Sequence, residues 1–262
     1  MENNKIKLEN ILMSDDVINA FTDNMSFICE LIPELTHTIG FNQNTPYHCY
    51  DVFTHTLYSI QNAPKDIHLR LTMLFHDIAK PLCYSEKDGV GHFYGHPQKS
   101  ADITKEILSK FGYNEDIILI VTQLIFYHDA QIRPRRKQIV RWLNRIGEDR
   151  FRQLLEVRRA DTLAQAPEYQ NSKLDDLIMI PALIDDVLNR QKRFSLKDLE
   201  INGRDLVDLG ISESVQVGII LNKLYNMVIN GDITNDKEKL LDVVKQDYLS
   251  CTPELIVKEV CK

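Results

Sequence analysis

The sequence lacks any apolar run that approaches the roughly 20 residues needed to span a bilayer. Its first residues, MENNKIKLENILMSDD, also lack the apolar core of a signal peptide. The cysteines are odd in number, widely scattered and without any CxxC pair, which argues against a disulfide framework and a thiolate zinc site. We therefore expect a soluble protein of the reducing cytoplasm with no membrane partner. The cysteines are Cys29, Cys49, Cys83, Cys251 and Cys261.

The sequence also lacks an excess of positive charge, since its net charge is −7. This charge argues against a general nucleic-acid binder. The charge is nevertheless uneven. Residues 133–159 contain ten Lys and Arg against three acidic residues. This basic segment is either a solvated helical face or a surface that attracts an anionic substrate.

Strand-like alternation of apolar and polar residues is scarce, whereas apolar residues at three- and four-residue spacing recur along the chain. The sequence thus predicts an all-α fold, with a helical bundle in residues 1–192 and a smaller C-terminal helical appendage in residues 193–262. Helices are expected over about 16–36, 50–61, 66–78, 97–112, 114–128, 135–146, 148–165 and 174–190. After a junction at 194–198, helical segments are expected over 203–210, 212–233 and 237–249.

Several residues suit the expected helix boundaries. Asp66 is typical of an N-cap, Pro97 of a first turn and Gly112 of a helix end. The glycine-rich stretch KPLCYSEKDGVGHFYGHP breaks the helical pattern. It predicts either a lid-like loop or a short hairpin.

No HExxH motif is present, so metal ligands would have to come from different helices. Six histidines and carboxylates fall at or next to the expected helix ends. A divalent transition metal binds imidazole nitrogens mixed with carboxylate oxygens, and converging helices can build such a site inside a bundle. Their spacing does not establish that they meet. They are His55, His76, Asp77, His96, His128 and Asp161.

The dipeptide His-Asp occurs twice, as His76-Asp77 in LFHDIAKP and as His128-Asp129 in FYHDAQIRP. Together with HCYDVFTHTLYSI, GHFYGHPQKSA and VRRADTLAQ, these runs closely resemble the HD-domain superfamily of metal-dependent phosphohydrolases. The likeness is greatest to the HD region of bacterial tRNA nucleotidyltransferases, the CCA-adding enzymes. The run INGRDLVDLGISESVQVGIILNKLYNMVINGDITNDKEKLL resembles the C-terminal helices of that family, so the resemblance covers roughly residues 16–241.

The chain departs from that family ahead of the HD region. Its members carry there a nucleotidyltransferase head with a Gly-Ser phosphate-binding turn and paired aspartates for magnesium. Here the sequence begins almost at the HD region, and no such turn or pair precedes it. We therefore do not expect CCA addition by this chain alone.

The resemblance implies one or two divalent ions. Mn, Ni, Co, Fe or Zn suit a mixed imidazole and carboxylate set better than magnesium, which prefers oxygen. His96 and His128 match histidines that bind a second metal or the substrate phosphate in some HD proteins. The principal ion is implied to bind His55, His76, Asp77 and Asp161.

Lys80 matches the lysine of an HDxxK motif and is implied to face a phosphate oxygen, although a lysine at a helix end also interacts with the helix dipole. Asp129 is predicted to be a helix-terminal bystander. His48 and His92 are predicted to be loop residues. The residues implied to act in catalysis are Asp77, Lys80, His96 and His128.

Such an ion lowers the pKa of water and polarises a phosphoryl oxygen. The resemblance therefore implies hydrolysis of phosphomonoesters or cyclic phosphodiesters, with nucleotides, tRNA or other RNA ends as the substrate class. The competing hypothesis is a non-catalytic module that binds RNA or a separately encoded nucleotidyltransferase. The complete ligand set favours the enzyme, because a structural module has no need of a buried charged cluster. The sequence leaves the exact substrate and the oligomeric state open.

Overall fold

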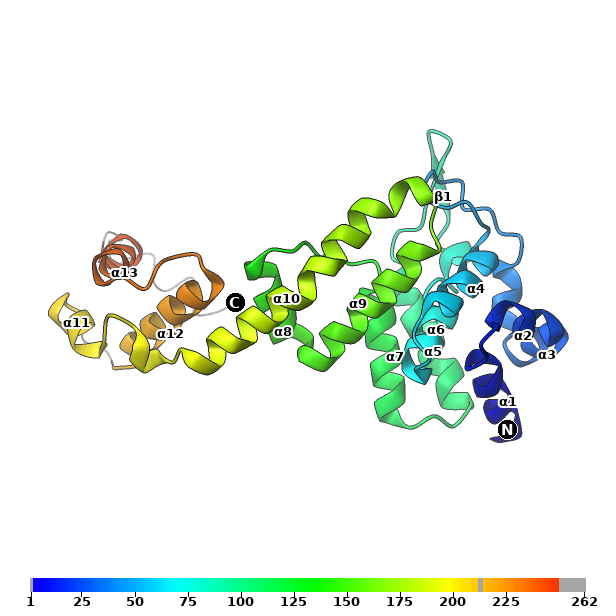
Figure 1. The fold of residues 1–262 in the computed structure, drawn as a ribbon, viewed down its shortest axis with the longest axis horizontal. Helices are drawn as coiled ribbons and strands as arrows, with labels where there is room; N and C mark the ends of the chain where they lie inside the picture. Colours follow the sequence, from blue (N-terminus) through cyan, green and yellow to red (C-terminus); the bar gives the residue numbers. More distant parts are fainter. Residues whose placement is uncertain (1, 212–213, 250–262) are drawn as a thin grey trace. The chain divides into compact units, whose positions relative to one another are not determined.

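The structure, a computed structural model, describes residues 2–211 and 214–249 of the chain. The fold is all-α, as the sequence predicts, with one two-stranded hairpin among the described residues (Figure 1). In this part of the chain no helix is long and apolar enough to cross a membrane.

The chain divides into two compact units. Among the described residues, the first comprises 2–133 and 145–179, and the second comprises 134–144, 180–211 and 214–249. The division into domains at residues 192 and 193 stays a prediction, because compactness alone does not show which segment folds independently.

The first unit packs α4 against α5 and α9, α5 against α7, and α6 against α7. The apolar residues at helical spacing lie in its core, for example Leu71, Leu74 and Phe75 of α5, each at most 1% exposed. Its elements are α1 (Glu2–Leu12), α2 (Val17–Asp23), α3 (Met25–Leu31), η1 (Pro33–Thr38), α4 (Val52–Asn62), α5 (Ile67–Phe75), η2 (Lys80–Leu82), β1 (Ser85–Lys87), β2 (Val90–His92), α6 (His96–Lys110), α7 (Glu115–Tyr127), α9 (Glu148–Leu163) and η3 (Pro167–Tyr169).

The predicted boundary residues have their expected roles. The Asp66 carboxylate accepts hydrogen bonds from backbone N–H groups in the first turn of α5. The Asn114 side chain, which was not singled out from the sequence, caps α7 in the same way. Pro97 lies in the first turn of α6. Gly112 follows that helix with φ of 73°, a left-handed conformation that favours glycine.

The prediction of a single helix over residues 16–36 is wrong. The chain forms α2 and α3 and then the 3₁₀ helix η1. Asn24 ends α2, because its N–H bonds to the carbonyls of Phe21 and Thr22 and its side chain to that of Ala20. Pro33 then prevents an α-helix from continuing, since it has no N–H. The sequence reasoning also missed α1, whose short apolar face is buried although most of its residues are polar.

The glycine-rich stretch forms the hairpin rather than an open loop. Strands β1 and β2 pair antiparallel, and Asp88 and Gly89 form the turn with φ of 53° and 75°. Asp-Gly with positive φ at both positions is typical of a two-residue hairpin turn. Gly91 in β2 donates its N–H to the carbonyl of Asn44 at 2.8 Å. A Cβ at this position would lie 2.2 Å from the carbonyl oxygen of Gln43, so the close approach requires glycine.

The second unit has its own apolar core, in which Leu206, Ile220 and Leu240 are fully buried. The predicted junction at 194–198 contains a 3₁₀ turn. Cys251 and Cys261 lie outside the described residues, and the described Cys29, Cys49 and Cys83 are free thiols. The elements of this unit are most of α8 (Arg136–Ile146), the C-terminal part of α10 (Asn171–Arg193), η4 (Leu196–Asp198), α11 (Gly203–Asp208), α12 (Ser214–Asn230), α13 (Lys237–Val244) and η5 (Lys245–Leu249).

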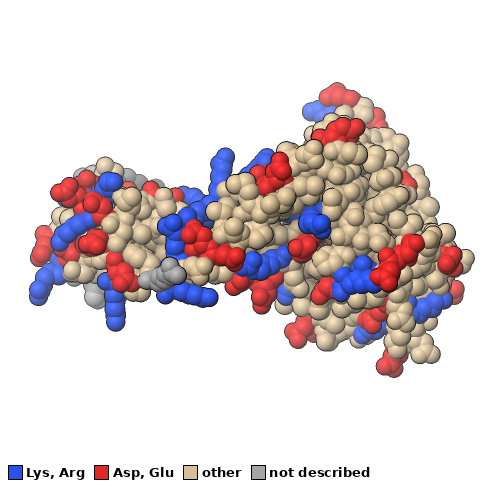
Figure 2. All heavy atoms as spheres, viewed as in Figure 1, with Lys and Arg blue, Asp and Glu red and all other residues tan. Residues whose placement is uncertain are grey.

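The basic segment, residues 133–159, is divided between the two units. Several of its charges already have acidic partners: Arg136 pairs with Asp186 in the second unit, and Arg152 pairs with Glu148 in the first. On the face shown in Figure 2, Lys and Arg side chains are interspersed with Asp and Glu. The attraction of an anionic substrate by this segment stays a prediction.

Candidate metal centre

Five helices of the first unit bring the six predicted ligands together. His55 lies in the first turn of α4, His76 directly follows α5, His96 begins α6, and His128 directly follows α7. Asp77 comes next after His76, and Asp161 lies near the end of α9. We call these six residues the His/Asp cluster. The four imidazoles and Asp77 are buried, and the Asp161 side chain is 13% exposed.

Each imidazole of the cluster is oriented by a backbone carbonyl. Nδ1 lies 2.7 Å from the Met73 carbonyl oxygen for His76, and 2.7 Å from that of Ile125 for His128. For His55 and His96 the corresponding distances are 3.1 and 2.8 Å. A carbonyl oxygen only accepts, so Nδ1 carries the proton and Nε2 presents a lone pair in the neutral ring. A histidine that binds a metal through Nε2 is oriented in this way.

The Nε2 atoms face one another in pairs. His55 Nε2 lies 3.3 Å from His76 Nε2 and 3.0 Å from Asp161 Oδ1. His96 Nε2 lies 3.2 Å from His128 Nε2. Within the described residues these atoms form two sets with the spacing of metal ligands. We call them the His55 group (His55, His76, Asp161) and the His96 group (Asp77, His96, His128).

Asp77 lies between the two groups. Its Oδ2 is 3.2 Å from His76 Nε2 and 3.6 Å from His55 Nε2, whereas its Oδ1 is 3.3 Å from His96 Nε2 and 3.5 Å from His128 Nε2. Neither carboxylate oxygen accepts a hydrogen bond of regular geometry. Lys80 brings one positive charge to Oδ2, whereas Oδ1 faces the lone pairs of His96 and His128, an arrangement that is unfavourable unless a cation separates them. The donor set therefore fits divalent cations.

The carboxylates of the cluster are ionised. Burial raises the pKa of Asp77, but His76 in its charged form and Lys80 outweigh this effect and hold the pKa well below its usual range. Burial also raises the pKa of Asp161, and His55, when its ring is charged and Nε2 also carries a proton, outweighs this effect and lowers it. Two anionic ligands are thus present near neutral pH.

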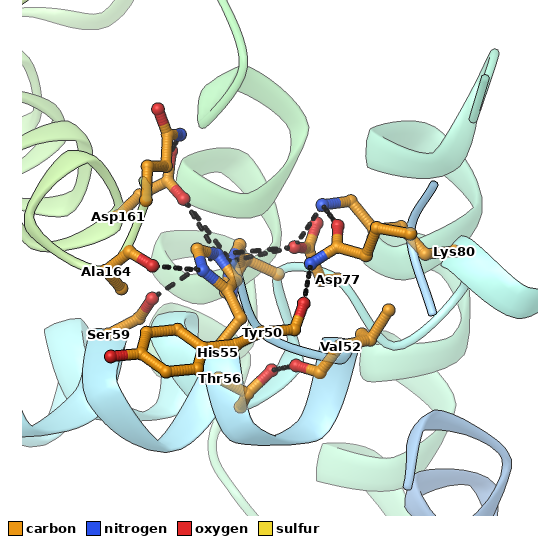
Figure 3. A network of polar contacts seen from close by, with 12 residues as sticks. Tyr50, Val52, His55, Thr56, Ser59, Asp77, Lys80, Asp161 and Ala164 are labelled. Atoms are coloured by element: carbon orange, nitrogen blue, oxygen red, sulfur yellow. Dashed lines mark hydrogen bonds and ion pairs between the residues drawn. The ribbon is translucent and has the colours of Figure 1, made fainter. Parts of the chain in front are cut away.

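Lys80 is nearly buried and lies at the same site. Its Nζ is 2.6 Å from Asp77 Oδ2 (Figure 3). It also donates a hydrogen bond of 2.7 Å to Gln43 Oε1. Gln43 is fully buried and donates to the Tyr50 carbonyl through its own amide. Lys80 is therefore held in place by the loop that also contacts Gly91 of the hairpin.

The sequence reasoning missed two glutamines. Gln43 positions Lys80, and Gln165 donates its amide to Asp161 Oδ2 at 3.0 Å. Lys173 in turn donates to Gln165 Oε1 at 2.6 Å. Gln165 is one helical turn after Asp161, and this i, i+4 spacing is a signal that the sequence contains. Gln43 had no such signal, because it lies in a loop.

A cavity of about 470 Å³ opens onto the cluster. Asp77, His96, His128 and Asp161 contribute to its wall. Asp129 is exposed at this cavity and belongs to neither ligand group among the described residues. It stays a prediction that both residues of His76-Asp77 bind metal, whereas Asp129 of the second dipeptide is a bystander.

Two histidines outside the cluster also line this cavity. His48 lies in a loop, as predicted, and packs edge-on against His55 with ring centroids 4.8 Å apart. Burial, with a contribution from Lys80, lowers the pKa of His48 to about 2, so this ring is neutral. His92 is the last residue of β2 rather than part of an irregular loop.

Comparison with known proteins relates this chain to tRNA nucleotidyltransferases. Residues 98–244 match the family described as tRNA nucleotidyltransferase domain 2, putative, and this match covers more than half of the chain. The chain belongs to this family. The matched range contains His128 and Asp161 and begins after the other cluster residues.

Two curated relatives give the same result. The chain is 25% identical over 216 residues to a CC-adding tRNA nucleotidyltransferase of Thermus thermophilus, which covers 79% of this chain and 47% of the relative. It is 43% identical over 53 residues to a CCA-adding enzyme of Ligilactobacillus salivarius, covering 20% of this chain and 13% of that protein. The chain thus spans about half the length of the first relative. The predicted relation to tRNA nucleotidyltransferases is confirmed.

Proposed function

We propose that this protein is a metal-dependent phosphohydrolase of the HD type that acts on phosphomonoesters or cyclic phosphodiesters of nucleotides or RNA ends. The observation that carries the proposal is the His/Asp cluster, in which four Nε2 lone pairs and two ionised carboxylates converge at the wall of a cavity. The relation to tRNA nucleotidyltransferases supports the substrate class.

The cluster offers two groups of residues that could each hold an ion. The His55 group would hold one ion, the His96 group would hold the other, and Asp77 would contribute one oxygen to each. Bound divalent ions of the Mn, Ni, Co, Fe or Zn type supply charge stabilisation for a phosphoryl oxygen and activate water for attack. In the one-ion alternative, His96 and His128 contact the substrate phosphate instead.

The remaining roles belong to side chains of the cavity wall. Lys80 directs its ammonium group to the Asp77 edge of the cavity, where it would bind a phosphate oxygen. Gln165 holds one Asp161 oxygen and leaves Oδ1 directed toward His55. The neutral His48 adds no positive charge that would oppose a cation at this site.

The direct test is turnover on a panel of phosphoesters. The purified protein is incubated with 2′,3′-cyclic nucleotides, nucleoside monophosphates and an aryl phosphate, with Mn or Ni and with chelator. We expect turnover that chelator abolishes, and loss of that turnover in His76→Ala. His37→Ala is the matched control, because His37 is exposed and lies outside the cluster. Absence of chelator-sensitive turnover at full metal occupancy rejects the phosphohydrolase.

The second candidate is a non-catalytic module that binds RNA or a separate nucleotidyltransferase. It is favoured by the family match, which extends over the second unit, and by the names of the relatives. Retarded migration of tRNA with the protein in a native gel, together with a metal-filled but inactive cluster, would support this candidate over the enzyme.

A further inference from the structure

The segment between the hairpin and α6 places an exposed aromatic side chain at the cavity. Tyr94 lines the cavity and is 78% exposed, the largest exposure among the large apolar and aromatic side chains of the described residues. An aromatic ring at the wall of a cavity, with one side open, is available for contact with a planar ligand.

One face of the Tyr94 ring is already covered. It stacks on the His92 ring with centroids 5.3 Å apart and an interplanar angle of 7°, and its hydroxyl lies 3.4 Å from His92 Nδ1. The high exposure means that the opposite face is open. A planar stack of two rings with one free face has the geometry that a further planar ring requires.

The backbone on both sides of this stack is anchored. On one side, Gly91 donates to the Asn44 carbonyl and packs closely on Gln43. On the other, the Phe93 carbonyl accepts from Nδ1 of the cluster residue His96 at 2.8 Å. The Tyr94 ring is therefore attached to backbone that also orients a ligand of the candidate metal centre.

Another aromatic side chain of the cavity is less available. Tyr47 also lines the cavity and is 48% exposed. Its ring contacts the edge of Tyr169 at 4.7 Å between centroids and receives the Lys173 ammonium 5.6 Å from its centroid. Because neighbouring groups occupy this ring, Tyr94 offers the more accessible face.

We infer that Tyr94, supported by His92, stacks on the base of the substrate, so that the cavity takes a nucleotide rather than a base-free phosphoester. This inference rests on the proposed function, with the phosphate directed to the His/Asp cluster. The cavity of about 470 Å³ lies within the range typical of small-molecule sites, roughly 300–1,000 Å³. Phosphate hydrolysis alone needs no aromatic surface, and stacking accepts any base because every base has a π face.

The test compares two ligands that differ only in the base. Adenosine 5′-monophosphate and ribose 5-phosphate are titrated into the metal-loaded protein by calorimetry, and both are also used as inhibitors of the best substrate. The wild-type protein should bind the nucleotide on the order of tenfold more tightly, the gain expected from one stacked base. Tyr94→Ala should remove this preference, and Tyr94→Phe should keep it.

Tyr58→Ala is the matched control. Tyr58 is also exposed and stacked on one ring, that of Tyr50, with centroids 4.6 Å apart, but it does not line the cavity. It should keep the wild-type preference, and metal content should be equal in all four proteins. A preference near one in the wild type, or one that Tyr94→Ala leaves unchanged, overturns the inference.

The two proposals fail separately. Base-dependent binding without turnover of any phosphoester rejects the phosphohydrolase and retains the stacking role of Tyr94. Turnover with no base preference retains the phosphohydrolase and rejects the stacking role of Tyr94. A trinucleotide with a terminal phosphate distinguishes a free nucleotide from an RNA end as the source of the base. If the trinucleotide binds more tightly than the mononucleotide, and Tyr94→Ala weakens its binding equally, the ligand is an RNA end.

Discussion

Asp77→Asn is expected to abolish the stabilisation of the protein by metal, whereas Asp129→Asn leaves it intact. The two oxygens of Asp77 face different ligand groups, Oδ2 toward His76 and Oδ1 toward His96. A neutral amide binds a dication more weakly than a carboxylate, so a single substitution weakens both ion sites. Asp129 is exposed and lies in neither group.

The magnitude follows from binding linkage. An ion present at 100 times its dissociation constant stabilises the native state by about 2.7 kcal/mol. For a unit of this size, that corresponds to a rise of roughly 5–10 °C in Tm for one ion and about twice that for two. Asp77→Asn should lose both increments, and Asp129→Asn should lose neither. His128→Ala should lose about one, because it removes a ligand of the His96 group alone.

The assay is differential scanning calorimetry with Mn or Ni and with chelator, supported by metal analysis of each protein. Every variant is compared with its own chelated form, which cancels direct effects of the substitution on the metal-free protein. Circular dichroism checks the helical content. If Asp129→Asn empties the site while Asp77→Asn stays filled, the assignment is reversed. Equal losses from both would mean that both dipeptides are ligand pairs.

Two further predictions concern the hairpin anchor and the basic segment. Gly91→Ala places a Cβ 2.2 Å from a backbone oxygen and should reduce the free energy of unfolding by about 1–3 kcal/mol in chemical denaturation. Gly218→Ala, whose added Cβ meets nothing within 4 Å, is the control, and equal stability of the two would contradict the anchor. Reversing the exposed charges Arg135 and Arg141 to Glu should lower kcat/KM mainly at low salt, because the Debye length is only about 10 Å at 0.1 M. An unchanged kcat/KM at low ionic strength would return this segment to a solvated helical face.

Local features of the fold could be predicted from the sequence because their causes are local. The cap at Asp66 and the stop at Gly112 depend on the bonding of one side chain and on one backbone angle. The prediction of one long helix over residues 16–36 was wrong although the causes of the breaks are also local. The apolar spacing was continuous, but the bonds made by Asn24 and the missing N–H of Pro33 interrupt the helix.

The sequence by itself determined the residue types of the candidate site and their place at helix ends. The resemblance to the HD-domain superfamily assigned these residues to one site, because ligands on separate helices form no short sequence motif. Only the tertiary structure decided that Asp77 presents one oxygen to each group, that backbone carbonyls orient the imidazoles, and that Gln43 holds Lys80. Helical periodicity is encoded in neighbouring residues, whereas the meeting of side chains from five helices depends on how their apolar faces pack, and spacing along the chain does not encode that packing.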